Sequence, residues 1–182
     1  MTPDQEVMLT RRTVAKGAMW SLPVIAAAIA LPGAAASVAL DYTLALTSYD
    51  VAPAIGTTPL SPNQIFNTVG IIENLGPDTA PNLRAQVTFP SSTVPNEFTV
   101  SAGWVITSVT EVNVGGILRW HVALSHAAPL PANQSINFIV TTRTRVAGTF
   151  PVGESTYNSV GRVFGADGAI EGELTDSYTV LR

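Results

Sequence analysis

The sequence contains no cysteine and only two histidines among its 182 residues. Without cysteine there is no disulfide, no thiolate metal site and no cysteine nucleophile. The lipidated cysteine that begins a mature bacterial lipoprotein is excluded for the same reason. A zinc site needs several convergent ligands, and two histidines do not provide them. The sequence therefore predicts neither a bound metal nor another cofactor.

Lysine is almost as scarce, because Lys16 is the only one. Of the 9 basic and 13 acidic residues, 3 and 2 lie in the first 36 positions, which leaves 6 arginines, 11 acids and a net charge of −5 beyond them. Binding to nucleic acid or to anionic lipid requires a basic face. The charge balance argues against both partners. An isopeptide crosslink through lysine is excluded beyond residue 36.

A pair of arginines lies near the N-terminus. Arg11, Arg12 and Lys16 are the basic residues of the first 36, and the apolar Val14 lies between them. This spacing resembles the twin-arginine translocation motif, although Phe or Leu is more usual where Val14 stands. The resemblance implies export of the folded protein by the twin-arginine (Tat) translocase, in the style of high-GC Gram-positive bacteria.

The segment that follows completes a secretory signal peptide. Residues 17–31 form an alanine-rich apolar run of 15 residues, and a track of small residues that includes Ala34 and Ala36 precedes Ser37. A membrane-spanning helix needs about 20 apolar residues, so this run is short for an anchor. The pattern fits a signal that signal peptidase cuts between Ala36 and Ser37. We expect a signal peptide over residues 1–36, one domain over 37–182, and a secreted or envelope protein without a stable membrane span.

Beyond Ser37 the apolar residues recur at every second position, which is the period of a β-strand. Leu83, Ala85, Val87 and Phe89, for example, alternate with polar residues. Turn signals built from Gly, Pro, Asn and Asp separate such runs. No segment after residue 40 has a helical apolar stripe. We expect seven to nine strands in two packed antiparallel sheets, at roughly residues 40–50, 64–74, 82–89, 97–101, 104–113, 117–125, 135–146, 156–165 and 169–181.

The turn over residues 74–82 has a distinctive sequence, Asn-Leu-Gly-Pro-Asp-Thr-Ala-Pro-Asn, and Val-Thr-Phe-Pro follows at 87–90. Together they resemble the repeated Ig-like module of bacterial surface proteins, an uncharacterised conserved-repeat family. The pattern of that family is N-x-G-P-x-x-A-x-N before a strand that ends in Leu-Pro. Phe89 replaces the usual Leu.

Later parts of the chain match the same family in order. They are Gly103-Trp104, the strand with Trp120, and residues 129–135 before a long strand. The family usually has Gly where Ala132 or Asn133 stands. The resemblance covers most of residues 40–182 and implies an antiparallel Ig-like β-sandwich. It brings no catalytic residues.

The two tryptophans of this part are interpreted as core residues. Trp120 has apolar neighbours at two-residue spacing, which favours burial between the sheets over an exposed platform for sugar. Trp104 follows a glycine at a strand start, so a ligand-facing position is a weaker alternative to burial.

Candidate chemistry is sparse. His121, on the polar face of its strand beside Arg119, and His126, in the next loop, are expected at the surface. The hydrolase elbow and the paired-histidine zinc motif are absent. Four acids near the C-terminus offer oxygen ligands for Ca²⁺, but their alternation favours a solvated edge that blocks strand pairing; these are Asp167, Glu171, Glu173 and Asp176.

These features predict an exported, non-enzymatic Ig-like module that binds a protein or polymer, such as a polysaccharide, through loops or a sheet edge. A structural envelope component that self-associates by edge pairing is the alternative. An enzyme is less favoured, because no nucleophile–base pair or metal constellation is visible in the sequence.

Overall fold

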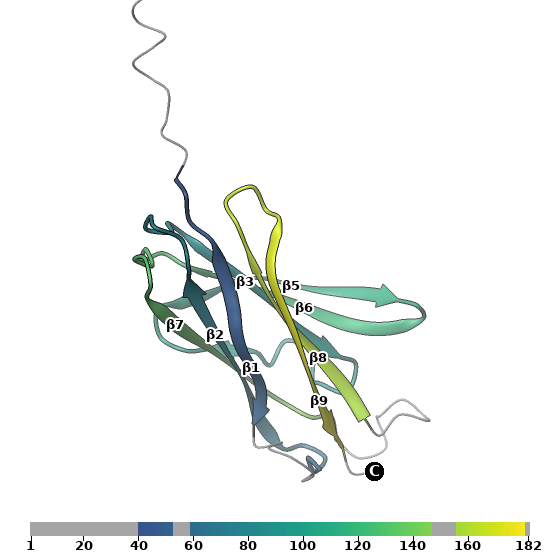
Figure 1. Ribbon diagram of the computed structural model, residues 1–182. Coiled ribbons are helices and arrows are strands. Elements are labelled where there is room, and N and C mark those ends of the chain that lie inside the picture. The colour runs from purple at the N-terminus through teal and green to yellow at the C-terminus, as the bar shows by residue number, and fades with distance from the viewer. Residues whose placement is uncertain (1–39, 53–58, 147–155, 181–182) are drawn as a thin grey trace, which may run out of the picture. The chain divides into compact units, whose positions relative to one another are not determined.

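The computed structural model describes residues 40–52, 59–146 and 156–180 (Figure 1). The chain divides between Ala39 and Leu40, and every described residue belongs to the second part. The export motif and the cleavage site remain predictions, because their residues lie outside the described ones: Arg11, Arg12, Lys16, Ala34, Ala36 and Ser37.

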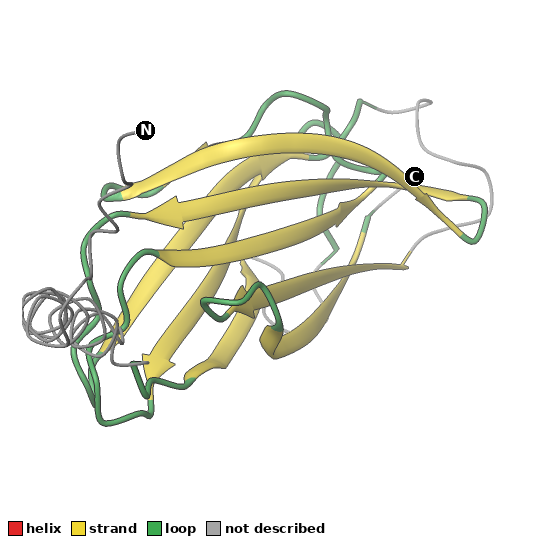
Figure 2. Ribbon diagram, turned by 90° about the horizontal axis from the view of Figure 1, so that it is seen from above, coloured by secondary structure: helices red, strands yellow, loops and turns green. Residues whose placement is uncertain are grey.

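Nine antiparallel strands make up the described part, which confirms the predicted all-β class. In the views of Figures 1 and 2 these residues form strands and loops only. The first strand begins later than expected, and the others lie within three residues of their predicted bounds at nearly every end. The strands are β1 (Leu44–Ala52), β2 (Ile65–Asn74), β3 (Leu83–Pro90), β4 (Thr99–Val100), β5 (Trp104–Val114), β6 (Ile117–His126), β7 (Ser135–Arg143), β8 (Thr156–Phe164) and β9 (Ile170–Thr179).

The strands form two sheets with the orders β1-β2-β7-β4 and β5-β6-β3-β8-β9. In the immunoglobulin constant-type sandwich, strands A, B, E and D form one sheet and C, F and G the other. Here β1, β2, β7 and β4 take the first set of places, and β3, β8 and β9 take the second. The β5–β6 hairpin is an insertion between D and E that pairs with the free edge of β3. The fold is therefore an Ig-like β-sandwich, as predicted.

The core lies between the two sheets and follows the predicted alternation. Leu83, Ala85, Val87 and Phe89 of β3 are all buried. Trp104 is a core residue, as expected, and its indole nitrogen donates to the carbonyl oxygen of Asn137 over 2.9 Å. The largest side chains enclosed with them are Phe66, Phe138, Leu60, Ile72 and Leu124.

The β5–β6 hairpin departs from the expected burial. The alternation predicts that Leu118 and Trp120 continue the apolar face of β6, but Leu118 is exposed and Trp120 is half-buried against the core. The reason is geometric, since the hairpin runs beyond the sandwich, where no opposite sheet covers it (Figure 1). Gly115 and Gly116, both with positive φ, turn the chain at its tip, as their sequence predicts.

Acidic side chains of β9 join the edges of the two sheets. Glu171 accepts a hydrogen bond from the backbone N–H of Leu44, and Asp176 accepts one from Val51, both on the outer edge of β1. These bonds occupy edge N–H groups that would otherwise offer a template for another strand. Two of the four acids thus occupy N–H groups of a strand edge, but the edge is that of β1 and not of their own strand, and Asp167 and Glu173 have other partners. The four acids are used separately, not as one set of ligands.

The asparagine that opens the 74–82 turn explains the distinctive sequence there. Asn74 is buried, and its amide group donates to the carbonyl oxygens of Asp78 (2.8 Å) and Leu130 (3.0 Å). It thereby joins this turn to the loop before β7. Asn133 in that loop has φ +57°, a conformation that glycine adopts most easily and asparagine tolerates. The departure from glycine at this position is therefore compatible with the same turn.

Candidate functional site

The described residues contain no group of three or more His, Asp and Glu side chains close enough to hold a metal ion. The two histidines lie apart. The ring of His126 contacts Trp104 at an interplanar angle of 50°, with centroids 5.1 Å apart, whereas His121 is half-buried on the outer face of the five-stranded sheet. In the same part of the chain we find no helical segment with the length and hydropathy to cross a bilayer.

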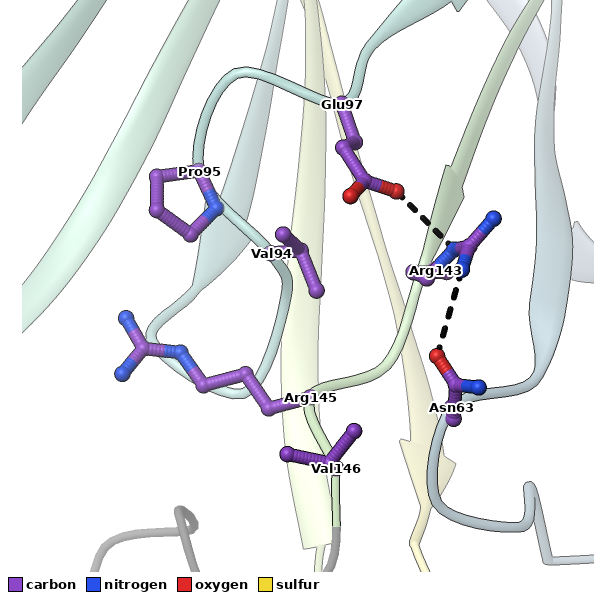
Figure 3. Close-up of a pocket in the computed structure, with 7 residues that line it drawn as sticks. All are labelled: Asn63, Val94, Pro95, Glu97, Arg143, Arg145 and Val146. Atoms are coloured by element: carbon purple, nitrogen blue, oxygen red, sulfur yellow. Dashed lines mark hydrogen bonds and ion pairs between the residues drawn. The ribbon is translucent and has the colours of Figure 1, made fainter.

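A hollow of about 370 Å³ lies beside the end of β7 (Figure 3). A second hollow, of about 320 Å³, adjoins it and shares Glu97 and Arg143 with it, and the two hollows are here together called the β7 groove. Together they are lined by Asn63, Ile65, Val94, Pro95, Asn96, Glu97, Phe98, Thr99, Thr141, Thr142, Arg143, Arg145 and Val146.

The groove exists because the chain before β4 leaves its neighbour. Thr93 bridges Thr144, Val94 donates its backbone N–H to the carbonyl oxygen of Arg143, and Thr99 pairs with Thr141, but residues 95–98 bulge away from β7. Asn96, with φ +66°, turns the bulge back toward the sheet. Proline at position 95 also suits such a bulge, because it has no N–H to donate to a strand ladder. The edge of β7 between Thr141 and Arg143 is thus bordered by this bulge instead of by a paired strand.

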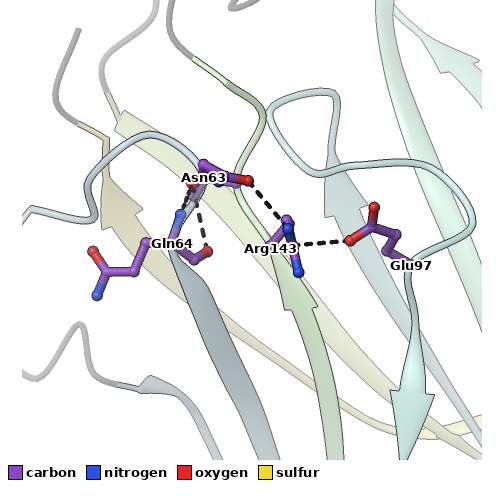
Figure 4. A network of polar contacts seen from close by, with 5 residues as sticks. Asn63, Gln64, Glu97 and Arg143 are labelled. Atoms are coloured by element: carbon purple, nitrogen blue, oxygen red, sulfur yellow. Dashed lines mark hydrogen bonds and ion pairs between the residues drawn. The ribbon is translucent and has the colours of Figure 1, made fainter.

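Arg143 divides the groove and is held from both sides (Figure 4). Its Nε lies 2.9 Å from a carboxylate oxygen of Glu97, and an Nη donates to Oδ1 of Asn63 over 3.2 Å. Asn63 has φ +60°, so the turn before β2 is shaped to present its side chain. The guanidinium charge is therefore fixed in position and balanced by one carboxylate.

A second arginine borders the other end. Nε of Arg145 donates to the carbonyl oxygen of Thr93 over 3.2 Å, and its side chain extends in the opposite direction from Arg143 (Figure 3). Thr142 lines the groove as well, and its buried hydroxyl has no partner among the described residues. Polar hydrogen-bonding groups thus lie along a groove with Val94 and Pro95 as apolar wall. Such a surface can hold an extended segment of a protein or polymer.

Sequence reasoning singled out none of these groove residues. Glu97 and Arg143 are far apart in the chain, and each looks like an ordinary polar residue of a strand end. The one available signal was the pair of arginines at alternate positions, Arg143 and Arg145, at the end of a predicted strand. Alternation places both on the outer face of the sheet.

No protein-family model matches the chain, and no curated protein sequence is similar to it. Several solved structures match the chain at low sequence identity. A CARDB domain from Pyrococcus furiosus is 13% identical over 78% of this chain and 93% of that one, with a TM-score of 0.36. A cohesin module from a Clostridium perfringens family 33 glycoside hydrolase is 14% identical (78% and 98%, TM-score 0.43). The major pilin subunit of Bacillus cereus is 12% identical (78% and 40%, TM-score 0.38).

Proposed function

We propose that the protein is an exported, non-enzymatic Ig-like module that binds a protein or polymer at the cell envelope or outside the cell. The β7 groove carries the binding part of this proposal. It has two arginines that hydrogen bonds hold at defined positions, and it is bordered by the bulge over residues 95–98. Side chains that hydrogen bonds already hold in place lose little conformational entropy when they bind a ligand.

The export part of the proposal rests on the sequence. The paired Arg11 and Arg12, the apolar run after them and the Ala-rich track before Ser37 supply the elements of a Tat signal peptide. The Tat translocase and signal peptidase would then be the partners during export. A protein that crosses the membrane already folded needs no disulfide formation outside, and this chain has no cysteine.

The first experiment concerns location and partners. Culture supernatant and cell fractions of the bacterium that makes the protein are analysed by mass spectrometry. We expect a mature form that begins at Ser37, in the supernatant or the envelope. Uncut protein confined to the cytosol contradicts the proposal.

The second experiment concerns the groove. The purified processed protein is sedimented with envelope preparations, together with the variants Arg145→Ser and, as a control on another face, Thr110→Ser. We expect the wild type and the control to co-sediment equally and Arg145→Ser to lose at least several-fold in affinity. Equal binding by all three places the contact elsewhere.

One observation favours a second function, self-assembly. β5 is the outer strand of its sheet, its exposed residues include Val105 and Val114, and Glu111 is its only charged residue. An edge with little charge can pair with another strand. Gel filtration across a range of concentrations separates the two functions, because a concentration-dependent oligomer supports assembly and a monomer supports the binding module.

A further inference from the structure

The five-stranded sheet forks on its outer face. β3 lies between β6 and β8 but ends at Pro90, whereas β6 and β8 both extend beyond it. Without their common neighbour the β5–β6 hairpin and the β8–β9 pair diverge (Figure 1). A hollow of about 330 Å³ lies between them, here called the fork. Its lining residues are Thr88, Val114, Arg119, His121, Asn158, Val160, Arg162 and Thr175.

The fork is cationic in a chain that is otherwise acidic. Its lining contains two arginines and, among the described residues, no carboxylate. Arg119 donates to the backbone carbonyl oxygen of Asn158 over 3.3 Å, a neutral partner that leaves its charge unbalanced. Arg162 is paired with Glu173, which lies just outside the lining on β9. The two guanidinium groups come from different strands and face one hollow.

A buried hydroxyl in the same hollow has no partner. Thr88 is 4% exposed, and its Oγ1 makes no hydrogen bond with any described residue. Because its neighbours Val87 and Phe89 point into the core, Thr88 points to the outer face, where the fork lies. An unsatisfied buried hydroxyl is costly, and a ligand oxygen that accepts its hydrogen bond would remove that cost.

His121 lies between the two cations. Burial lowers the pKa of its imidazole, and Arg162 and then Arg119 lower it further. The residues opposite it on the neighbouring strands, Thr88 on β3 and Thr110 on β5, carry no charge. The imidazole is therefore neutral near pH 7, and the repulsion from both arginines opposes its protonation.

We propose that the fork binds an oxyanion, a phosphate or carboxylate group, through the guanidinium group of Arg119 and the hydroxyl of Thr88, while Arg162, held by Glu173, contributes a second positive charge beside the hollow. Guanidinium groups suit such ligands because their planar N–H donors match the oxygens of carboxylate and phosphate. The bound anion also offsets the positive potential at His121, so binding is coupled to proton uptake by that imidazole.

The test follows the histidine resonances by NMR while inorganic phosphate, or in a second arm acetate, is added to the purified protein. The chain has two histidines, so His126 serves as the internal reference. We expect a saturable shift of His121 alone and a higher pKa for it at saturation. Arg119→Gln is expected to weaken phosphate binding at least tenfold and Thr88→Val several-fold, whereas Arg84→Gln, at the other end of β3 and outside both hollows, leaves it unchanged.

Two results would overturn the proposal. One is a shift of both histidines that does not saturate, in both the phosphate and the acetate arm. The other is unchanged phosphate affinity in both Thr88→Val and Arg119→Gln. If Arg119→Gln does not fold, unchanged phosphate affinity in Thr88→Val is sufficient to overturn the proposal. Because the probe is a small ion, the outcome does not depend on the proposed envelope ligand of the β7 groove.

Discussion

The β7 groove and the fork each contain one arginine paired with a carboxylate, Arg143 or Arg162, and one that donates to a backbone carbonyl, Arg145 or Arg119. They differ in where the carboxylate lies, because Glu97 is part of the lining of the groove and no carboxylate is part of the lining of the fork. In the groove, Arg143 is paired with Glu97 and further held by Asn63. In the fork, Arg162 is paired with Glu173, which lies outside the lining, and Arg119 donates to the backbone carbonyl of Asn158 without a carboxylate partner among the described residues. An arginine with a carboxylate partner is already satisfied, and an incoming anion must displace that partner. An arginine on a neutral acceptor keeps most of its attraction for an anion.

The number of arginines at a surface therefore does not by itself locate an anion site. Both surfaces carry two arginines within a chain of net negative charge. The position of the nearest carboxylate decides which of the two surfaces is available to an anion. The groove is better suited to a mixed polar and apolar segment, and the fork to a single charged group.

The largest expected effect concerns the scaffold beneath the two sites. A Cβ added at Gly70 would lie 2.2 Å from the Phe138 ring, and one at Gly161 would lie 2.4 Å from the Tyr49 ring. Both rings are buried and have no room to move aside. Gly70→Ala in the sheet of the groove and Gly161→Ala in the sheet of the fork should each lower the free energy of unfolding by about 1–3 kcal/mol.

Chemical denaturation measures both variants, with the exposed Ser108→Ala as control. If only one variant loses stability, one sheet adapts to the added methyl group and the other does not. The two sheets would then differ in how tightly they are packed around these glycines.

Alkaline pH offers a second comparison. Tyr49, bonded to Ser159 behind the fork, and Tyr178, bonded to Ser92 behind the groove, both have pKa values raised mainly by burial. A raised folded-state pKa stabilises the protein below the unfolded value of about 10, and this stabilisation is lost as pH rises beyond it. The described residues include no lysine to obscure the titration.

Melting temperature is measured from about pH 8 to about pH 11, on either side of the ordinary tyrosine pKa. We expect it to fall steeply above pH 10, and less steeply in Tyr49→Phe and in Tyr178→Phe. A flat profile in the wild type contradicts the burial of both phenols.

The unpartnered hydroxyls provide a smaller contrast. Thr88 in the fork and Thr142 in the groove are both buried without a hydrogen-bond partner. Replacing either by valine keeps the shape and removes an unsatisfied group, so each variant should be more stable by roughly 1 kcal/mol. Only Thr88→Val should also weaken phosphate binding. Thermal unfolding with and without phosphate checks both statements, and a loss of stability in either variant would reveal a partner for the hydroxyl.

The smallest expected effect comes from removing the carboxylate that distinguishes the β7 groove from the fork. Glu97→Gln leaves Arg143 without its carboxylate, and the exposed ion pair contributes at most about 1 kcal/mol to folding. We expect stability to change little and weak phosphate binding to appear in the β7 groove. Calorimetric titration of the double variant Glu97→Gln, Arg119→Gln isolates this new binding. No heat of binding there would mean that the carboxylate is not what separates the two sites.

The sequence is sufficient to predict the sandwich because its signals are local. Alternation along β3 and the glycine turn at Gly115-Gly116 each act within a few residues, and both are seen in the structure. The exposure of Leu118 was missed, because alternation shows which face a residue takes and not whether an opposite sheet reaches that far. The export signal stays a prediction.

Neither the β7 groove nor the fork could be predicted from such local sequence signals. The groove depends on where the chain leaves β7, and the fork on where β3 ends relative to β6 and β8. Arg119 and Arg162 are brought together only by pairing through β3. His121 beside Arg119 was noticed in the sequence and interpreted as a surface residue, because a polar strand face that binds a ligand looks the same as one that binds water.

The most direct test of the account compares the two arginines in one titration. The side-chain Nε–H resonances of Arg119 and Arg143 are followed by NMR as phosphate is added to the purified protein. We predict that the Arg119 resonance shifts to saturation while that of Arg143 stays in place. A saturable shift of Arg143 with Arg119 unmoved would contradict the claim that the carboxylate partner decides where the anion binds.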